Sequence, residues 1–121
     1  MVDTPRRKNL LLVEDDPDIR AAVAEVLTLE GYSVTEAGHG LEGLERLARL
    51  ELPCLILLDM MMPVMDGREF LARVQADPVL RGCTVLIVTA SFVELPPGAV
   101  GVLRKPYELS ELLELLVQHC P

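Results

Sequence analysis

The fold of this chain is indicated best by the run Leu55-Ile56-Leu57-Leu58-Asp59-Met60-Met61-Met62-Pro63, where four aliphatic residues lead directly into a carboxylate and a methionine-rich turn. An uninterrupted apolar run of this length is typical of a strand that is buried on both faces, as in a parallel sheet. Asp59 then lies at the carboxyl end of that strand. Open α/β sheets bind their ligands at this edge, so Asp59 is the first candidate site residue.

Other apolar runs also end in polar residues. They are Leu10-Leu11-Leu12-Val13 before Glu14-Asp15-Asp16, Val85-Leu86-Ile87-Val88 before Thr89, and Val100-Gly101-Val102-Leu103 before Arg104-Lys105-Pro106. If these strands lie parallel in one sheet, their carboxyl ends share one edge. Three acids (Asp15, Asp16 and Asp59), the hydroxyl of Thr89 and the amine of Lys105 are predicted to meet there.

Helices are predicted between the strands. Asp16-Pro17 is a typical helix start, because an acid caps the first N–H groups and proline suits the first helical position. Strands separated by helices need right-handed crossovers, which predicts a parallel sheet with helices on both faces. The segment 91–99 contains Pro96-Pro97-Gly98 and is too short for a mean-length helix with its connections, so the fourth helix is expected to be short or absent.

The last helix is predicted over residues 108–119. Its inward face is expected to carry Leu109, Leu112, Leu113, Leu116 and Val117. Leu115 is expected to lie off that face, either as a single exposed leucine or as a contact for a partner or a second copy.

Length and charge limit the function. The 121 residues are expected to form one domain, 1–121, with residues 1–8 as a polar, basic tail. The formal charge of −8 repels a phosphate backbone, and two Phe, two Tyr and no Trp offer few stacking groups, so direct nucleic-acid binding is not expected. No apolar run is long enough for a membrane span, which predicts a cytoplasmic protein.

The three cysteines, Cys54, Cys83 and Cys120, do not have a metal-ligand spacing. They are expected to be reduced packing residues of a cytosolic protein.

The predicted acid cluster calls for a cation. Two carboxylates ~4 Å apart oppose each other by about 4 kcal/mol at an effective dielectric near 20. Oxygen ligands without His or Cys favour Mg²⁺, which binds a few carboxylates together with a phosphoryl oxygen. An aspartate in such a site can attack phosphorus and form an acyl phosphate, while the cation and Lys105 hold the transferring oxygens.

Taken together and in order, the motifs resemble the receiver domain of bacterial two-component response regulators over the whole chain. The matching pieces are Leu12-Val13-Glu14-Asp15-Asp16, Leu57-Leu58-Asp59-Met60-Met61-Met62-Pro63, Met65-Asp66-Gly67, Thr89-Ala90 and Lys105-Pro106. The resemblance implies a flavodoxin-like, open, five-stranded parallel sheet of order 2-1-3-4-5.

The resemblance also implies the chemistry of the site. Asp59 would be the phosphoacceptor in a phosphorelay, receiving its phosphoryl group from a sensor histidine kinase or a phosphotransfer protein. Mg²⁺ would be held by Asp16, Asp59 and the main-chain carbonyl of Met61, with Asp15 assisting. Transfer would be self-catalysed and reversed slowly, so the chain would be a phosphoprotein and not a turnover enzyme.

Several residues would have supporting roles by the same similarity. Thr89 and Lys105 would meet the phosphoryl group, Ala90 and Gly67 would be structural, the Lys105–Pro106 bond would be cis, and Met61 and Ser91 occupy positions that tend to set the lifetime of the acyl phosphate. Whether an output domain or a separate protein receives the signal, and whether the chain dimerises, stays open.

Two features depart from the family, and both concern output. Members usually carry a full fourth helix where this chain has residues 91–99, and a switch Tyr or Phe where it has Val102. Phosphorylation is still expected to shift the conformational population, and we expect the loop from Phe92 to Gly98 to reorder when Thr89 moves, with Phe92 as a substitute ring.

Two other functions remain to be weighed. One is a receiver-like interaction domain whose phosphorylation-dependent readout is lost or altered, which the same two departures support. The other is a phosphohydrolase that uses Asp59 as nucleophile. Against this function, the residue two positions beyond Asp59 is Met61 and not an acid, and the chain has no insertion to cover a substrate.

Overall fold

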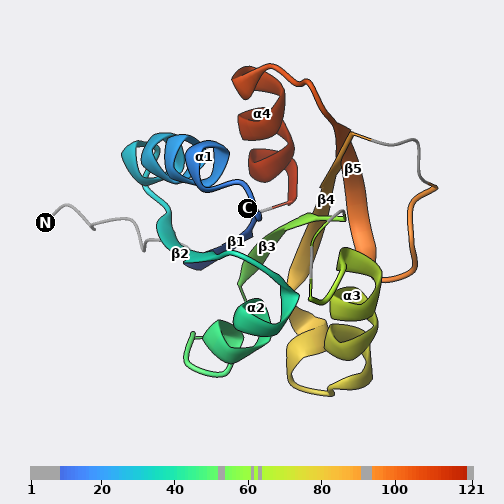
Figure 1. Cartoon of the computed structure of the whole chain (residues 1–121). Coiled ribbons are helices and arrows are strands. Elements are labelled where there is room, and N and C mark those ends of the chain that lie inside the picture. Colours follow the sequence, from blue (N-terminus) through green and yellow to red (C-terminus); the bar gives the residue numbers. More distant parts are fainter. Residues whose placement is uncertain (1–8, 52–53, 61, 63, 91–93, 120–121) are drawn as a thin grey trace, which may run out of the picture.

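The computed structural model describes residues 9–51, 54–60, 62, 64–90 and 94–119, in which strands and helices alternate around one parallel sheet (Figure 1). The strands are β1 (Asn9–Val13), β2 (Ser33–Ala37), β3 (Leu55–Asp59), β4 (Thr84–Thr89) and β5 (Ala99–Arg104); the helices are α1 (Pro17–Leu29), α2 (Gly40–Leu47), α3 (Gly67–Ala76) and α4 (Leu109–His119), with a short 3-10 helix, η1 (Leu80–Gly82). The sheet order is β2-β1-β3-β4-β5, which confirms the flavodoxin-like prediction.

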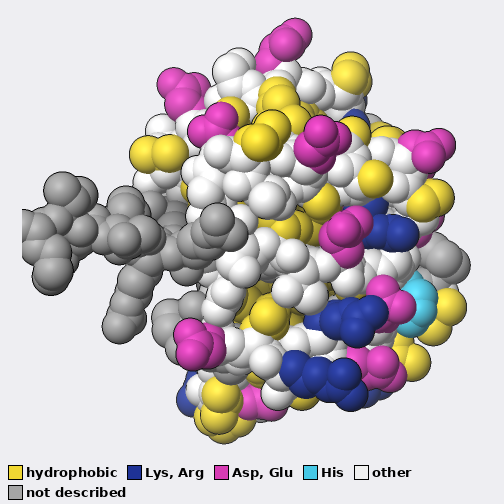
Figure 2. Space-filling view, turned by 90° about the vertical axis from the view of Figure 1, so that its left-hand side faces the viewer, with side chains coloured by type: hydrophobic (Ala, Val, Ile, Leu, Met, Phe, Trp, Pro, Cys, Tyr) yellow, Lys and Arg dark blue, Asp and Glu magenta, His cyan; other side chains and the backbone are white. Residues whose placement is uncertain are grey.

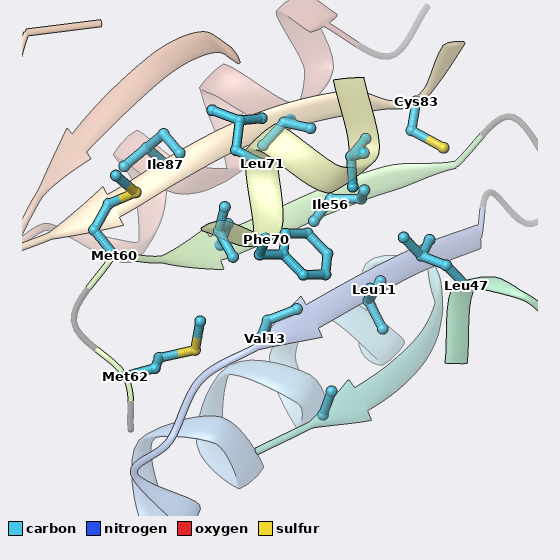
Figure 3. Packing of buried hydrophobic residues seen from close by; sticks show 14 of the residues in the cluster. Leu11, Val13, Leu47, Ile56, Met60, Met62, Phe70, Leu71, Cys83 and Ile87 are labelled. Carbon is cyan, nitrogen blue, oxygen red and sulfur yellow. The ribbon is translucent and has the colours of Figure 1, made fainter. Parts of the chain in front are cut away.

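The sheet is covered on both faces, with α1 and α4 on one side and α2 and α3 on the other (Figure 1). Successive strand residues point to opposite faces, so the apolar runs supply two cores at once. Leu10 and Leu12 pack with α1 and α4, whereas Leu11 and Val13 pack with α2 and α3. Figure 3 shows the second core gathered around Phe70 of α3, which is fully buried.

Close packing at the start of α3 depends on a glycine. A Cβ on Gly67 would lie 2.7 Å from the Met60 Cα and 2.8 Å from the Asp59 carbonyl oxygen. The Gly67 N–H donates to the Met60 carbonyl at 3.2 Å, and the neighbouring Asp66 caps the helix by accepting from the Glu69 N–H at 3.0 Å. Gly67 therefore lets α3 begin directly against the end of β3, as its predicted structural role requires.

The connection from β4 to β5 spans residues 90–98. Of its described residues, Ala90 and 94–98, none is helical, in agreement with the predicted short or absent fourth helix. Gly98 adopts a φ of +94°, and a Cβ there would lie 2.4 Å from Cδ of Gln75 in α3. The end of this connection thus packs directly on α3.

Helix α4 faces the sheet along a line that differs from the predicted one. Leu112 and Leu116 are fully buried, but Val117 is 68% exposed and Leu109 is 36% exposed. Leu115, which was expected to lie off the inward face, packs against the core beneath α1 and α4. An inward line centred between Leu112 and Leu116 places Leu113 and Leu115 about 80° to either side and Val117 about 120° away. The predicted exposure of Leu115 was therefore wrong.

The surface carries both signs of charge. On the face formed by α1, β2 and α2, acidic side chains are scattered and Lys and Arg side chains gather in the lower half (Figure 2). Within the described ranges, every helix is too short or too polar to cross a lipid bilayer.

Candidate functional site

The carboxyl ends of β1, β3, β4 and β5 converge at one edge of the sheet. Register places Asp59 of β3 opposite Val88 of β4, and Thr89 opposite Arg104 of β5. The Lys105 N–H donates to the Thr89 carbonyl at 2.8 Å. The sheet therefore brings together the acid, the hydroxyl and the amine that the sequence placed at this edge.

Three carboxylates form the centre of the site. Ligand oxygens of Glu14, Asp15 and Asp59 all lie within 4.8 Å of one another. Glu14 is 4% exposed and Asp59 is 6% exposed, whereas Asp15 is open to solvent. Two buried acids and one exposed acid at this spacing repel each other, so the group favours a cation at its centre.

The backbone fixes Glu14 in this cluster. Its N–H donates to the Ala37 carbonyl of β2 at 3.0 Å, which extends the β1–β2 pairing by one residue. Its carbonyl accepts from Arg20 Nη1 at 2.8 Å, and Arg20 also pairs with Glu36 at 3.5 Å. Sequence reasoning did not include Glu14 among the site residues.

Lys105 supplies the positive charge next to the acids. Its Nζ lies 2.7 Å from Glu14 Oε1 and 3.5 Å from Asp59 Oδ2. Burial of the amine acts to lower the pKa of Lys105, but the hydrogen bond that Lys105 donates to Glu14 and the negative charges of Asp59 and Glu14 outweigh burial and raise that pKa above its usual value. Lys105 therefore stays charged and partly neutralises the carboxylates.

Asp16, predicted as a metal ligand, is engaged elsewhere. Its Oδ1 accepts from the Asp18 N–H at 2.9 Å and the Ile19 N–H at 3.2 Å, which makes it the N-cap of α1. Among the described residues, the carboxylate cluster includes Asp15 but not Asp16. The acids that the structure brings together are thus shifted by one residue, to Glu14 and Asp15.

Some of the remaining predicted site residues are described by the structure, and others lie outside the described residues. Thr89 is fully buried at the end of β4 and is followed by the small, exposed Ala90. The Lys105–Pro106 bond is cis, as the resemblance implied. Met61, with its main-chain oxygen, and Ser91 lie outside the described residues.

An aromatic residue that sequence reasoning did not assign to the site lies beside it. Tyr107 follows the cis bond and helps line a small cavity of about 20 Å³, together with Glu14, Asp59, Val88 and other apolar residues. Burial raises the pKa of Tyr107, the Lys105 charge acts to lower it, and the Glu14 charge adds to the rise. The phenol therefore stays neutral, and its ring packs against the core beneath α1 and α4.

The methionines beyond Asp59 pack into the core on one face of the sheet. Met60, Met62 and Met65 are each less than 10% exposed and belong to the core beneath α2 and α3. Figure 3 shows Met60 and Met62 at one end of this core, where β3 ends. Apolar packing thus surrounds a polar edge made of carboxylates, a hydroxyl and an amine.

This arrangement suits a hard divalent cation and a phosphoryl group. Carboxylate oxygens are the ligands that Mg²⁺ prefers, and no nitrogen or sulfur ligand lies among the three clustered acids. A lysine at one side of the cluster can pair with the oxygens of a transferring group. The site can therefore hold a metal and bring Asp59 to an electrophilic phosphorus.

Comparisons with known proteins agree with this geometry. Residues 10–117 match the family model described as the response regulator receiver domain. Sporulation initiation phosphotransferase F of Bacillus subtilis is 33% identical over 121 residues, covering 94% of each chain. A receiver domain of a sensor histidine kinase from Pseudomonas aeruginosa, with a magnesium ion coordinated in its active-site cleft, superposes with a TM-score of 0.84 at 27% identity, covering 93% of this chain and 97% of that one.

A complex provides a third comparison. The structure of histidine kinase ThkA with response regulator TrrA, the latter from Thermotoga maritima, matches with a TM-score of 0.82 and 26% identity, covering 94% of this chain and 99% of that one. The family model spans nearly the whole described chain. The chain belongs to the response regulator receiver domains, the phosphoacceptor modules of two-component systems.

Proposed function

We propose that Asp59 is the phosphoacceptor of this receiver domain, and that the donor is a phosphohistidine on a sensor histidine kinase or a phosphotransfer protein. The observation that carries this proposal is the grouping of Asp59 with Glu14, Asp15 and Lys105 at the carboxyl edge of the sheet. A carboxylate oxygen of Asp59 attacks phosphorus, the P–N bond of the donor breaks, and the imidazole leaves. The likeness to TrrA, which was solved with a histidine kinase, supports this class of donor.

Mg²⁺ would be held by Glu14, Asp15 and Asp59 in place of the predicted set that included Asp16. When bound, it supplies a positive charge that stabilises the oxygens of the transferring phosphoryl group. The chain's own residues do the rest. Lys105, already 3.5 Å from Asp59, pairs with the new phosphoryl charge, and the buried Thr89 lies at the adjacent strand end to donate its hydroxyl.

The reaction would be stoichiometric. Asp59 is consumed when the acyl phosphate forms and returns only when water hydrolyses it, so each chain carries one phosphoryl group at a time. The protein would thus act as a switch and not as a turnover enzyme. Phosphorylation adds roughly two negative charges at the sheet edge, which shifts the balance between conformations.

A direct test uses a small-molecule phosphodonor with Mg²⁺ and intact mass spectrometry. The native chain should gain one phosphoryl mass increment, and Asp59→Asn should gain none. Asp18→Asn is a matched control, because Asp18 is an exposed aspartate outside the cluster. An increment that survives in Asp59→Asn would overturn the assignment of Asp59, and the absence of an increment in the native chain would overturn the proposed chemistry.

A second function has a specific observation in its favour. Residues 94–98 are not helical and Val102, where members carry an aromatic, packs against the core beneath α2 and α3. A receiver domain that docks on a partner without a phosphorylation-dependent readout would tolerate both features. Equal binding of the phosphorylated and unphosphorylated chain to its histidine kinase would favour this alternative.

A further inference from the structure

A pair of cysteines lies at the end of the sheet opposite the acidic site. Cys54 immediately precedes β3 and Cys83 immediately precedes β4. Leu55 and Thr84, the next residues, are register partners in neighbouring parallel strands, and the Thr84 N–H donates to the Cys54 carbonyl at 3.0 Å. The two cysteines are therefore side by side on adjacent strands.

Their sulfur atoms are in contact. Cys54 Sγ lies 3.7 Å from Cys83 Sγ and donates its hydrogen to it, and both residues are free thiols. Neighbouring strands are spaced about 4.8 Å apart, and disulfides join Cα atoms about 4.4 to 6.8 Å apart. A disulfide requires the sulfurs to approach by a further ~1.7 Å, to about 2.0 Å, which a small rotation of the side chains and a slight backbone shift can provide.

The backbone on one side has room to make that shift. Gly82, directly before Cys83, has no heavy atom within 4 Å of the place where a Cβ would lie. The Cys83 N–H donates to the Leu80 carbonyl at the end of η1, at 2.9 Å. Leu80 also lines an open groove of about 460 Å³ between α2 and α3, so solvent reaches the start of η1, three residues before the buried Cys83.

We infer that Cys54 and Cys83 form a redox modification site, which a hydroperoxide closes to an intramolecular disulfide and a dithiol reopens. The prediction of three reduced packing cysteines treated each thiol separately. Adjacent buried thiols in sulfur contact have a different chemistry, because the first oxidised sulfur meets its partner before it meets water or another chain.

The reaction balances in two steps. The Cys83 sulfur attacks one oxygen of hydrogen peroxide, the O–O bond breaks, and a sulfenic acid and water form. The Cys54 sulfur then attacks the Cys83 sulfur, the S–O bond breaks, and the oxygen leaves as water with the Cys54 proton. The two thiols together lose two protons and two electrons, and the peroxide is reduced to two waters.

The hydrogen bond between the thiols decides which sulfur attacks. Cys83 accepts the hydrogen from Cys54, which lowers the pKa of Cys83 to about 6, and the same bond raises the pKa of Cys54. A thiolate and not a thiol is the nucleophile, so Cys83 reacts first and Cys54 resolves the sulfenic acid.

The effect on the fold is predictable. Figure 3 places Cys83 at the end of the core remote from Met60 and Met62, where β3 approaches the acidic site. The bridge would tie together the two strands that carry Asp59 and Thr89, but at their opposite ends. It would close the chain between residues 54 and 83, and constraining a loop of that size in the unfolded state raises the melting temperature by roughly 10 °C.

The experiment starts from a Cys120→Ser background, in which Cys54 and Cys83 are the only cysteines of the chain. Reduced protein is treated with hydrogen peroxide at neutral pH, unfolded, and alkylated before intact mass spectrometry. We expect a monomer that has lost two hydrogen atoms and takes up no alkyl group, and whose two thiols return with dithiothreitol. A tryptic map without reductant should join the peptide of residues 50–68 to that of residues 82–104.

The controls replace one cysteine at a time. Adding Cys54→Ser or Cys83→Ser to the background should leave no intramolecular cross-link and remove the rise in melting temperature. The peptide map of the background protein stands without these variants if either fails to fold. Oxygen addition to separate thiols, a bridge only between chains, or two thiols that remain free would each overturn the inference.

Discussion

Asp15 and Asp16 are neighbours in sequence with different tasks in the structure. Asp15 belongs to the carboxylate cluster, whereas Asp16 caps α1. We expect Asp15→Asn to raise the Mg²⁺ concentration needed for half-maximal phosphorylation on the order of tenfold, because it removes a charged ligand. Asp16→Asn should leave that concentration nearly unchanged, since asparagine caps a helix as well as aspartate does. Phosphorylation by a small-molecule donor, titrated with Mg²⁺, measures both.

The reverse order of effects would restore the ligand set predicted from the sequence. Melting temperature serves as the control for folding, and it should change little in either variant. Asp16→Ala is a further comparison, because it removes the helix cap and should lower the free energy of unfolding by about 1 kcal/mol. The Mg²⁺ concentration that this variant needs for half-maximal phosphorylation should stay unchanged.

The sequence contained a signal that excluded Asp16 from the cluster. Pro17 fits the first helical position, so Asp16 had to be the N-cap, whose side chain turns back to the helix N–H groups. Glu14 could not be recognised in the same way. Its place in the site follows from one further hydrogen bond of the β1–β2 pairing, to Ala37, and a strand's last paired residue is not encoded in its hydrophobic pattern.

The titration of Lys105 and Tyr107 predicts how stability depends on pH. In the folded state the pKa of Lys105 lies above its usual value of 10.5, and that of Tyr107 lies above its usual value of 10.0. Both side chains therefore keep their protons to a higher pH than in the unfolded chain. Their contribution is complete below about pH 10 and is lost as the pH rises through the folded-state pKa values. We expect the urea midpoint of metal-free protein, measured in a chelator, to fall from about pH 10 upward.

Tyr107→Phe separates the two contributions. It removes the tyrosine's share, so the alkaline fall in the urea midpoint should be shallower than in the native chain. A midpoint that rises over this pH range, or a fall that is equally steep in the variant, would contradict the raised pKa of Tyr107.

Among the elements, α4 shows how far periodicity can be trusted. The apolar residues of this helix could form the buried face in two overlapping ways, and the sequence does not choose between them. In the folded structure the buried face is centred on Leu112 and Leu116. Leu115→Glu should therefore lower the unfolding free energy by about 1–2 kcal/mol, because it places a charge against the core. Val117→Glu adds the same charge at an exposed position and should change stability by no more than about 0.5 kcal/mol.

Denaturant unfolding of the two variants at neutral pH gives this comparison directly. Equal stability in Leu115→Glu and Val117→Glu would mean that Leu115 does not pack on the core. Sedimentation of both variants also tests the earlier alternative, in which Leu115 is a contact between copies of the chain.

The start of α3 offers a second test at this scale. Alanine at position 67 would push a Cβ into the backbone of Met60 and Asp59, so Gly67→Ala should cost about 1–3 kcal/mol and reduce phosphorylation of the neighbouring Asp59. Gly82→Ala is the matched control, because open space surrounds Gly82. The denaturant midpoints of unfolding of the two variants give this comparison. An equal loss of stability in both would show that the backbone freedom of glycine matters and the close contact at position 67 does not.

Strands and turns with a clear local sequence pattern could be predicted. Contacts between residues on neighbouring strands could not, because they depend on how the sheet assembles. The strand Leu55–Asp59 coincides with the predicted apolar run and the carboxylate that follows it. The short connection before β5 was also predictable, because Pro96-Pro97-Gly98 opposes a helix in any context. The contact between Cys54 and Cys83 was not, since it needs the β3–β4 register that only the assembled sheet defines.

For the whole molecule, the remaining question is how charge at Asp59 reaches a partner surface. Thr89 ends β4, and Lys105 directly follows the last residue of the adjacent β5. We expect a shift at this edge to move residues 94–98 of the connection between the two strands. That connection returns at Gly98, whose backbone packs on Gln75 of α3. A rearrangement of residues 94–98 would therefore be transmitted to α3, without the helix or the aromatic that other members use.

Amide hydrogen exchange can detect this relay. Beryllofluoride with Mg²⁺ mimics the phosphoryl group, and we expect it to change protection in residues 94–98 and at the end of α3 near Gln75, while β1 keeps its protection because the sheet core does not move. Asp59→Asn with the same reagents is the control and should show no change. If protection in residues 94–98 stays the same in the native chain, the signal does not pass through this connection, and the interaction domain without a phosphorylation-dependent readout becomes the better account of its function.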